Sequence, residues 1–122
     1  MCCTMSFADV TKIGKFCYIL DNANKTATVT SGGDYGEYEL YIPTIVTYND
    51  TEYIVTSIGN DAFSGCSSLD HINIPYTVIS IGNQAFYGCS SLRDIMIPYG
   101  VNSIGQYVFK GCSNLLSITI PG

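Results

Sequence analysis

The sequence contains few charged residues, and most of those it has are acidic. Asp, Glu, Lys and Arg make up only 12% of its 122 residues, and the formal net charge is −5. No Lys or Arg lies between Lys25 and Arg93. Because this acidic stretch repels phosphate groups, we expect neither nucleic acid nor an anionic membrane surface as a partner. Since 47% of the residues are apolar, we expect one globular domain rather than a disordered chain.

Long hydrophobic runs are also missing. No apolar stretch approaches the roughly 18 residues that a membrane helix needs, so we expect no membrane insertion. The first residues, MCCTMSFADVTKIGK, lack the basic tip and long apolar segment of a signal peptide. On these residues alone, the chain is either cytoplasmic or the mature form of a secreted protein.

Repetition is what the sequence has in abundance. IGNDAFSGCSSLDHINIP at 58–75 returns as IGNQAFYGCSSLRDIMIP at 81–98 and as IGQYVFKGCSNLLSITIP at 104–121. The spacing between successive units is constant, and the first two units agree at 16 of 23 positions without a gap. A fixed period of this length is typical of a solenoid, so we predict three stacked repeats at 58–80, 81–103 and 104–122.

Each unit ends in the pattern Leu-x-x-Ile-x-Ile-Pro, which predicts the short strand of a leucine-rich repeat. Side chains alternate along a strand, so Ile72 and Ile74 should face the core while His71 and Asn73 face outward. Proline then ends the strand, because it has no N–H for the ladder. We expect residues 60–66 to form a short helical or 3₁₀ turn, which Gly65 leaves with a positive φ. The phenylalanines at 63, 86 and 109 should form one column.

Residues 1–57 do not repeat but are rich in β-prone segments, and we predict that they form a β-rich N-terminal cap with an irregular first rung. KFCYIL and KTATVT, joined by DNAN, should make one hairpin, and TIVTY and EYIVT, joined by ND, a second. YELYI, which ends at Pro43, should be the strand of the first rung. The ITIPG end leaves a strand edge open. We therefore expect that the natural protein continues, or that this edge meets a partner or a second copy by self-association.

These units resemble the BspA-like leucine-rich repeat family, whose repeat has the form Ile-Gly-x-x-Ala-Phe-x-Gly-Cys-x-x-Leu-x-x-Ile-x-Ile-Pro. Residues 58–75 meet every specified position, and the third unit departs only where Val108 replaces the alanine. The resemblance covers 58–122 strongly and 38–57 as an entry segment. It implies a secreted or cell-surface protein that adheres to host proteins or to other cells. We predict a mainly β solenoid with short helical or 3₁₀ turns and one parallel sheet along its concave side.

The outward strand positions differ between units while the inward positions are kept. We predict that this outward surface binds a protein ligand, with carbohydrate as a second ligand class, because tyrosine provides contact area at low entropic cost. Unconstrained drift of surface residues would explain the variation equally well. The candidate residues are Glu39, Tyr41, His71, Asn73, Tyr76, Asp94, Met96, Tyr99, Ser117 and Thr119.

The six cysteines raise the question of a metal or redox site. No Cys-x-x-Cys or paired Cys/His spacing indicates zinc, and no cofactor is implied. Cys66, Cys89 and Cys112 should stack as small buried side chains with free thiols, and Cys17 should be packed within its strand. A Cys66–His71 dyad is the one enzymatic arrangement to consider. We do not expect it to form, because the two side chains should point to opposite faces.

The sequence therefore leaves three functions to compare. The first is a non-catalytic binding or adhesion module of a secreted or surface protein. The second is a structural spacer, or a capping fragment of a longer repeat protein, with no ligand of its own. The third, a thiol enzyme, has the least support.

Overall fold

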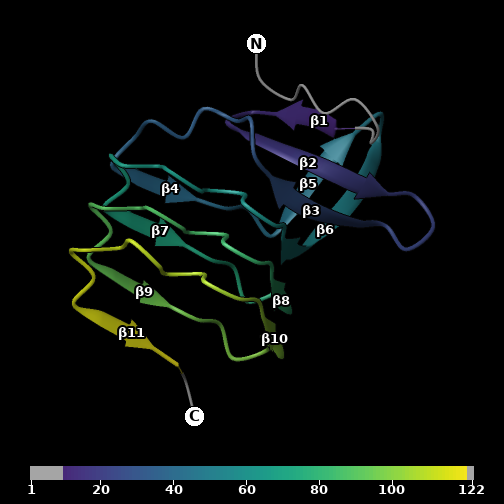
Figure 1. Ribbon diagram of the computed structural model, residues 1–122. Helices are drawn as coiled ribbons and strands as arrows, with labels where there is room; N and C mark the ends of the chain where they lie inside the picture. Colours follow the sequence, from purple (N-terminus) through teal and green to yellow (C-terminus); the bar gives the residue numbers. More distant parts are fainter. Residues whose placement is uncertain (1–9, 121–122) are drawn as a thin grey trace.

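The computed structural model describes residues 10–120, which form a solenoid of short strands in which no helix is found. Figure 1 shows the turns of the chain stacked one below the next, with the C-terminal end at the bottom. The strands are β1 (Val10–Ile13), β2 (Phe16–Asp21), β3 (Thr26–Thr30), β4 (Glu39–Tyr41), β5 (Ile45–Tyr48), β6 (Thr51–Ile58), β7 (His71–Asn73), β8 (Ser80–Ile81), β9 (Asp94–Met96), β10 (Ser103–Ile104) and β11 (Ser117–Thr119).

β4 lies on the same side of the stack as β7, β9 and β11, the strands with the Ile-x-Ile pattern, and the strand pairs on this side are parallel, as predicted (Figure 1). They do not form one continuous sheet, however, so that prediction is wrong. β4 pairs with β7, and β9 pairs with β11, as two separate two-stranded sheets. At the junction of the two pairs, the Arg93 N–H donates to the Asp70 carbonyl over 3.2 Å, just before β7 and β9 begin.

A seven-stranded sheet lies on the opposite side, and the sequence analysis did not predict it. Its order is β1-β2-β3-β6-β8-β10, with β5 paired to β6. The parallel part places Ile58 beside Ile81 and Ile81 beside Ile104, so that each isoleucine meets its equivalent in the next repeat. Both predicted hairpins belong to this sheet. β2 and β3 pair antiparallel, and so do β5 and β6, as predicted.

The β5–β6 turn is set by its two central residues. Asn49 and Asp50 both have positive φ values, 51° and 63°. Two consecutive residues in this region make a two-residue type I′ turn, whose twist suits a hairpin and for which Asn and Asp are suited.

A column of phenylalanines runs through the core, as predicted. The Phe63 and Phe86 rings stack with centroids 5.4 Å apart, and those of Phe86 and Phe109 are 5.9 Å apart, each pair with planes 6° apart. At the N-terminal end the Tyr35 ring lies 4.7 Å from Phe63, and the Phe16 ring meets Phe63 edge-on at 6.4 Å. Phe63 is consequently fully buried.

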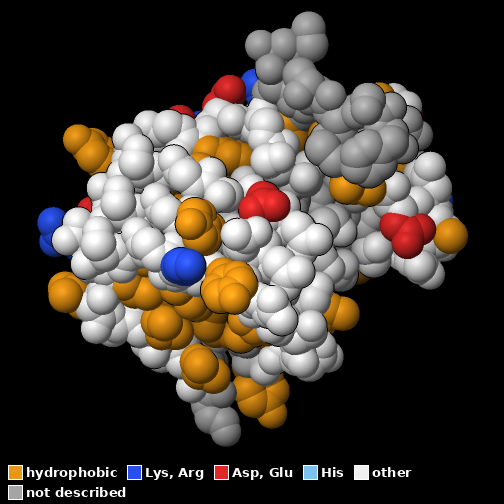
Figure 2. Space-filling model, viewed as in Figure 1, with side chains coloured by type: hydrophobic (Ala, Val, Ile, Leu, Met, Phe, Trp, Pro, Cys, Tyr) orange, Lys and Arg blue, Asp and Glu red, His pale blue; other side chains and the backbone are white. Residues whose placement is uncertain are grey.

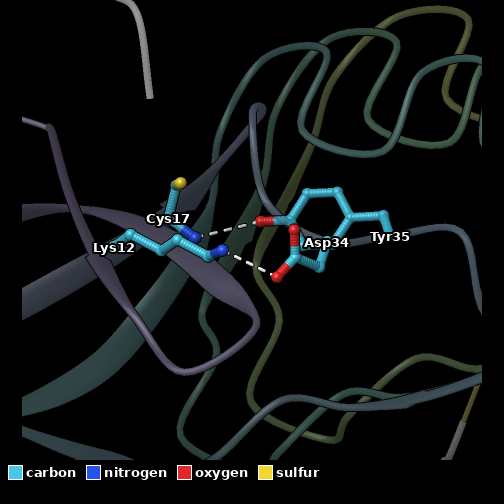
Figure 3. A network of polar contacts seen from close by, with 4 residues as sticks. All are labelled: Lys12, Cys17, Asp34 and Tyr35. Atoms are coloured by element: carbon cyan, nitrogen blue, oxygen red, sulfur yellow. Dashed lines mark hydrogen bonds and ion pairs between the residues drawn. The ribbon is translucent and has the colours of Figure 1, made fainter. Parts of the chain in front are cut away.

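Polar contacts hold Tyr35 in place, and Figure 3 shows its hydroxyl directed at the Cys17 backbone. Its hydroxyl donates to the Thr30 carbonyl over 2.7 Å and accepts the Cys17 N–H over 3.2 Å. Beside it, the Lys12 Nζ lies 2.7 Å from Asp34 Oδ2, which ties the loop after β3 to strand β1. The loop therefore closes against β1 and β2 with the Tyr35 ring turned inward.

The prediction of a helical or 3₁₀ turn at residues 60–66 is wrong, and the backbone hydrogen bonds of this segment explain the difference. Every second N–H group of this segment donates to a backbone carbonyl of the next rung. The donors Asp61, Phe63 and Gly65 bond to the carbonyls of Asn83, Ala85 and Tyr87, over 2.7–2.9 Å. A helix needs these donors for its own carbonyls. Their use between rungs leaves isolated turns instead.

The repeated glycines have two different roles. Gly65, Gly88 and Gly111 have φ values of 77°, 72° and 81°, as expected for leaving the turn. Gly82 instead allows close approach of two rungs, because a Cβ there would lie 2.5 Å from Asn60 Oδ1 and 2.6 Å from the Asn60 nitrogen.

We predict that Phe86→Ala costs more stability than Phe109→Ala. Phe86 is fully buried between two rings, so its removal should cost about 3–5 kcal/mol of unfolding free energy. Phe109 is stacked on one side and partly exposed, so about 1–3 kcal/mol is expected. Urea denaturation of both variants measures the difference, and equal losses would contradict the column.

Gly82→Ala should destabilise the fold by about 1–3 kcal/mol, since the added methyl group overlaps backbone that cannot move independently of the rung. Gly36→Ala is the matched control, because a Cβ at Gly36 meets nothing within 4 Å. Thermal unfolding of the pair checks this. A Gly82→Ala protein as stable as the control would show that the rungs are not in close contact.

Candidate functional site

The outer strand face carries the predicted ligand residues, and strand alternation is what exposes them. Leu40, Ile72 and Ile95, at the centres of β4, β7 and β9, are no more than 2% exposed. Their neighbours on either side point outward. The register then brings Glu39 beside His71, Tyr41 beside Asn73, Asp94 beside Ser117 and Met96 beside Thr119.

A hollow of about 500 Å³ lies on this face. Three large side chains on it are mostly in solvent: Tyr76 is 79% exposed, Tyr99 84% and Met96 62%. Eight of the ten predicted residues line this hollow, namely His71, Asn73, Tyr76, Asp94, Met96, Tyr99, Ser117 and Thr119. Glu39 and Tyr41 instead line a more open hollow at the β4 end of the same face. The structure thus brings the predicted residues together in two adjoining groups.

The polar side chains of the face pair mainly with one another. His71 Nδ1 lies 3.5 Å from Asp94 Oδ1, and the His71 ring is 6.2 Å from that of Tyr41. The Tyr41 hydroxyl donates to Glu39 Oε1 over 3.1 Å, and this hydrogen bond to a carboxylate raises the pKa of Tyr41. These groups are exposed, so their pairing orients side chains more than it stabilises the fold.

Tyr38 is a surface residue that the sequence analysis missed. It is 76% exposed and lines a hollow of about 470 Å³ next to the strand face, together with Asp70 and Arg93. Arg93 Nε lies 3.3 Å from Asp70 Oδ1. The sequence held a signal for it, because Tyr38 lies five residues before Pro43, as Asp70 does before Pro75 and Arg93 before Pro98.

The cysteines of the repeats form the expected column of free thiols. Cys89 is fully buried and its Sγ contacts the Phe63 carbonyl at 3.1 Å, whereas Cys66 and Cys112 are only partly buried. The hydrogen bond with Cys66, together with burial, raises the pKa of the Cys89 thiol, while the same bond lowers that of Cys66. The partners of His71 are Asp94 and Tyr41, whereas the Cys66 thiol meets that of Cys89.

Cys17 is buried as predicted, and it is also disulfide-bonded. Cys2 and Cys3 lie outside the described residues. Within residues 10–120, no three His, Cys, Asp or Glu side chains come together as metal ligands would. The same part of the chain has no helix of the length and hydropathy that crossing a membrane requires.

The family model described as BspA type leucine rich repeat region, of six copies, matches residues 42–122, more than half of the chain. The chain therefore belongs to the BspA-type leucine-rich repeat family. No curated protein matches its sequence at a significant level.

Several solved structures share this fold. A leucine-rich repeat protein of Bacteroides ovatus is 39% identical with a TM-score of 0.82, over 88% of this chain and 28% of that one. One of Bacteroides capillosus is 25% identical with a TM-score of 0.68, over 93% and 99%. A leucine rich cell surface protein of Faecalibacterium prausnitzii is 23% identical with a TM-score of 0.50, over 95% and 44%, and supports the fold alone. The chain thus spans less than half of two of these three proteins.

The different burial of the cysteines in the column predicts different rates of alkylation. In the folded protein Cys89 should react with iodoacetamide at least about a hundredfold more slowly than in urea, because its sulfur is buried and its thiolate is disfavoured. Cys66 should be modified before Cys89. Mass spectrometry of the two cysteine peptides over time measures both rates. Rapid modification of Cys89 in the native chain would contradict this packing and would revive the thiol-enzyme hypothesis.

Proposed function

We propose that this chain is a non-catalytic binding module of a secreted or cell-surface protein, and that it holds a protein ligand on the outer strand face. The observation that carries the proposal is the hollow of about 500 Å³ over β7, β9 and β11, with Tyr76, Tyr99 and Met96 largely in solvent. Side chains of this kind form the energetic centre of many protein interfaces. Membership of the BspA-type leucine-rich repeat family supports the surface location.

The chemistry of the hollow favours a protein over a small molecule. It extends along the stack from β7 to β11, and its lining includes the rings of Tyr76 and Tyr99 and the His71–Asp94 pair. Tyrosines can bury large areas while losing little rotamer freedom, which suits both protein and sugar ligands. Carbohydrate is therefore the ligand class to test beside protein.

A spacer without its own ligand is the second candidate. The observation in its favour is that the chain spans only 28% of the Bacteroides ovatus protein, so that a short stack of rungs is a small part of that molecule. A spacer needs a stable stack but places no demand on the outward residues.

The experiment compares two triple variants on immobilised ligands. The face variant carries Tyr76→Ser, Met96→Ser and Tyr99→Ser, and the control carries Tyr48→Ser, Tyr87→Ser and Tyr107→Ser, which are exposed away from the strand face. Surface plasmon resonance is run against purified extracellular-matrix and bacterial surface proteins, and a glycan array is probed in parallel. We expect the wild-type chain to bind at least one protein, the face variant to lose at least about tenfold in affinity, and the control to bind normally.

Each other outcome has a definite meaning. Binding that survives the face variant would place the interface elsewhere. Equal loss in both triple variants would indicate general destabilisation, which thermal unfolding of each variant would reveal. Binding to glycans alone would change the ligand class, and no binding to any surface would favour the spacer.

A further inference from the structure

The hollow of about 470 Å³ beside the strand face differs in chemistry from the hollow over β7, β9 and β11. The latter has three isoleucines, a methionine and a proline in its lining. The former is lined mainly by polar side chains, among them Tyr38, Ser68, Asp70, Ser91, Arg93 and Asn114, and we call it the Tyr38 hollow. A ligand that fits the Tyr38 hollow therefore offers many polar groups rather than an apolar anchor.

Much of the hydrogen-bonding capacity of this hollow is left unused by the protein. Within residues 10–120, the hydroxyls of Tyr38, Ser68 and Ser91 make no hydrogen bond to another protein group. Arg93 meets Asp70 through its Nε, which leaves the two Nη groups as donors. The Asn114 amide nitrogen donates to the Ser90 carbonyl over 2.8 Å, which leaves the amide oxygen as an acceptor. Donors and acceptors thus lie close together, as a ligand rich in hydroxyl groups requires.

The charges of the Tyr38 hollow balance, although the whole chain has a net charge of −5. Among the described residues, Asp70 and Arg93 are the charged groups of its lining, and they form an ion pair with Nε 3.3 Å from Oδ1. Figure 2 shows charged side chains of both signs scattered over the visible side of the molecule, without a patch of a single sign. Because no net charge concentrates an anion or a cation in the hollow, a neutral ligand is favoured.

Backbone hydrogen bonds between rungs hold the residues of this hollow in place. The Tyr38 carbonyl accepts the N–H groups of Asp70 and His71, over 2.7 and 3.0 Å, and the Asp70 carbonyl accepts the Arg93 N–H over 3.2 Å. The side chains of Tyr38, Asp70 and Arg93 therefore follow one another at about the spacing of neighbouring strands, roughly 5 Å. A pyranose ring is about as long as this spacing, so an extended oligosaccharide that runs along the stack places one sugar unit at each rung. A site that is fixed before binding also loses little entropy when the ligand arrives.

Tyr38 provides the apolar contact that a sugar needs. Its side chain is 76% exposed, and within the described part of the chain its ring contacts no other aromatic ring and no cation. The C–H groups on one face of a pyranose ring pack against such an aromatic surface, while the hydroxyls at the edge of the sugar reach polar side chains. The Tyr38 hollow combines both kinds of contact.

We propose that the Tyr38 hollow binds a neutral oligosaccharide, with one sugar ring stacked on Tyr38. The Asp70 carboxylate accepts hydrogen bonds from hydroxyls of the sugar, and the Arg93 guanidinium donates to their oxygens. This site is separate from the protein-binding face proposed above, because the Tyr38 hollow and the hollow over β7, β9 and β11 have no described lining residue in common. Neither proposal depends on the other.

Isothermal titration calorimetry with defined oligosaccharides tests the proposal. The neutral probes are maltohexaose, mannohexaose, xylohexaose and the hexamer of N-acetylglucosamine, and a heparin hexasaccharide is the anionic comparison. We expect at least one neutral probe to bind, and to bind more tightly than the heparin probe does. Its affinity should change less than about twofold between about 0.05 and 0.5 M NaCl, because salt does not screen the contacts of an uncharged ligand.

Three tyrosine variants locate the bound sugar. Tyr38→Ala should weaken binding of the neutral probe at least about tenfold, since it removes the stacking surface. Tyr38→Phe keeps the ring and should lose no more than about threefold. The matched control is Tyr76→Ala, because Tyr76 is 79% exposed but lines the other hollow, and this variant should bind the probe normally. Both tyrosines lie mostly in solvent, so the variants should fold, and thermal unfolding of each checks this.

Four results would overturn the proposal. The first is that no neutral probe binds, whether or not the hollow contributes to a protein interface. The second is tighter binding of the heparin probe than of every neutral probe, which would indicate an anion site at Arg93. The third is a loss of sugar binding in Tyr76→Ala as large as in Tyr38→Ala, which would place the sugar on the strand face. The fourth is an equal loss in Tyr38→Phe and Tyr38→Ala, which would exclude stacking on the ring.

Discussion

The return of the chain to the same place after every repeat is the constraint on which the other features depend. In the regular repeats the constant spacing of 23 residues places Phe86 over Phe63 and brings the N–H of Phe63 within reach of the Ala85 carbonyl. Stacking of the rings and inter-rung hydrogen bonding are thus satisfied by one register. Neither would hold a rung by itself, because a single turn of the solenoid buries too little apolar area to offset its ordering entropy.

This constraint divides each rung into a constant interior and a surface that can vary. Ile72 and Ile95 are both buried and identical, while the residues beside them change from His71 to Asp94 and from Asn73 to Met96. Because the outward side chains contribute little to the stack, they can be exchanged without loss of the fold. A scaffold with these properties suits recognition, since its ligand surface can change independently of its stability.

Sequence reasoning succeeded where a residue type has one dominant structural use. The Asn49-Asp50 pair, the glycines at 65, 88 and 111, and the phenylalanine column are of this kind, and each has the conformation or contact expected. It failed where partners far apart in the sequence decide the outcome. Residues 60–66 have the composition of a helical turn, but their N–H groups are bonded to the next rung. Nothing local to those residues reveals that competition.

In the candidate site, too, some features follow from local sequence and others depend on distant parts of the chain. Alternation along β7 and β9 was enough to place His71, Asn73, Asp94 and Met96 on one face, because a strand has only two faces. The interruption of the sheet after β7 could not be foreseen, since it depends on the paths of whole rungs rather than on any residue in the strands. Tyr38 was missed because its rung is irregular in sequence, although the β4–β7 register shows it to be equivalent to Asp70.

The two ends of the stack show what repetition requires of its boundaries. Each interior rung is covered on both sides by a copy of itself, so its sequence need not provide any special surface. On its N-terminal side Phe63 meets the rings of Tyr35 and Phe16, and the hydrogen bonds of Tyr35 hold its ring in place. Residues 104–120 keep the interior pattern instead, including isoleucines that suit burial and not solvent. Since the same side chains are buried one rung earlier, their exposure is a property of position and not of sequence. The apolar packing that stabilises the interior rungs therefore favours contact of these isoleucines with any surface that can act as the next rung.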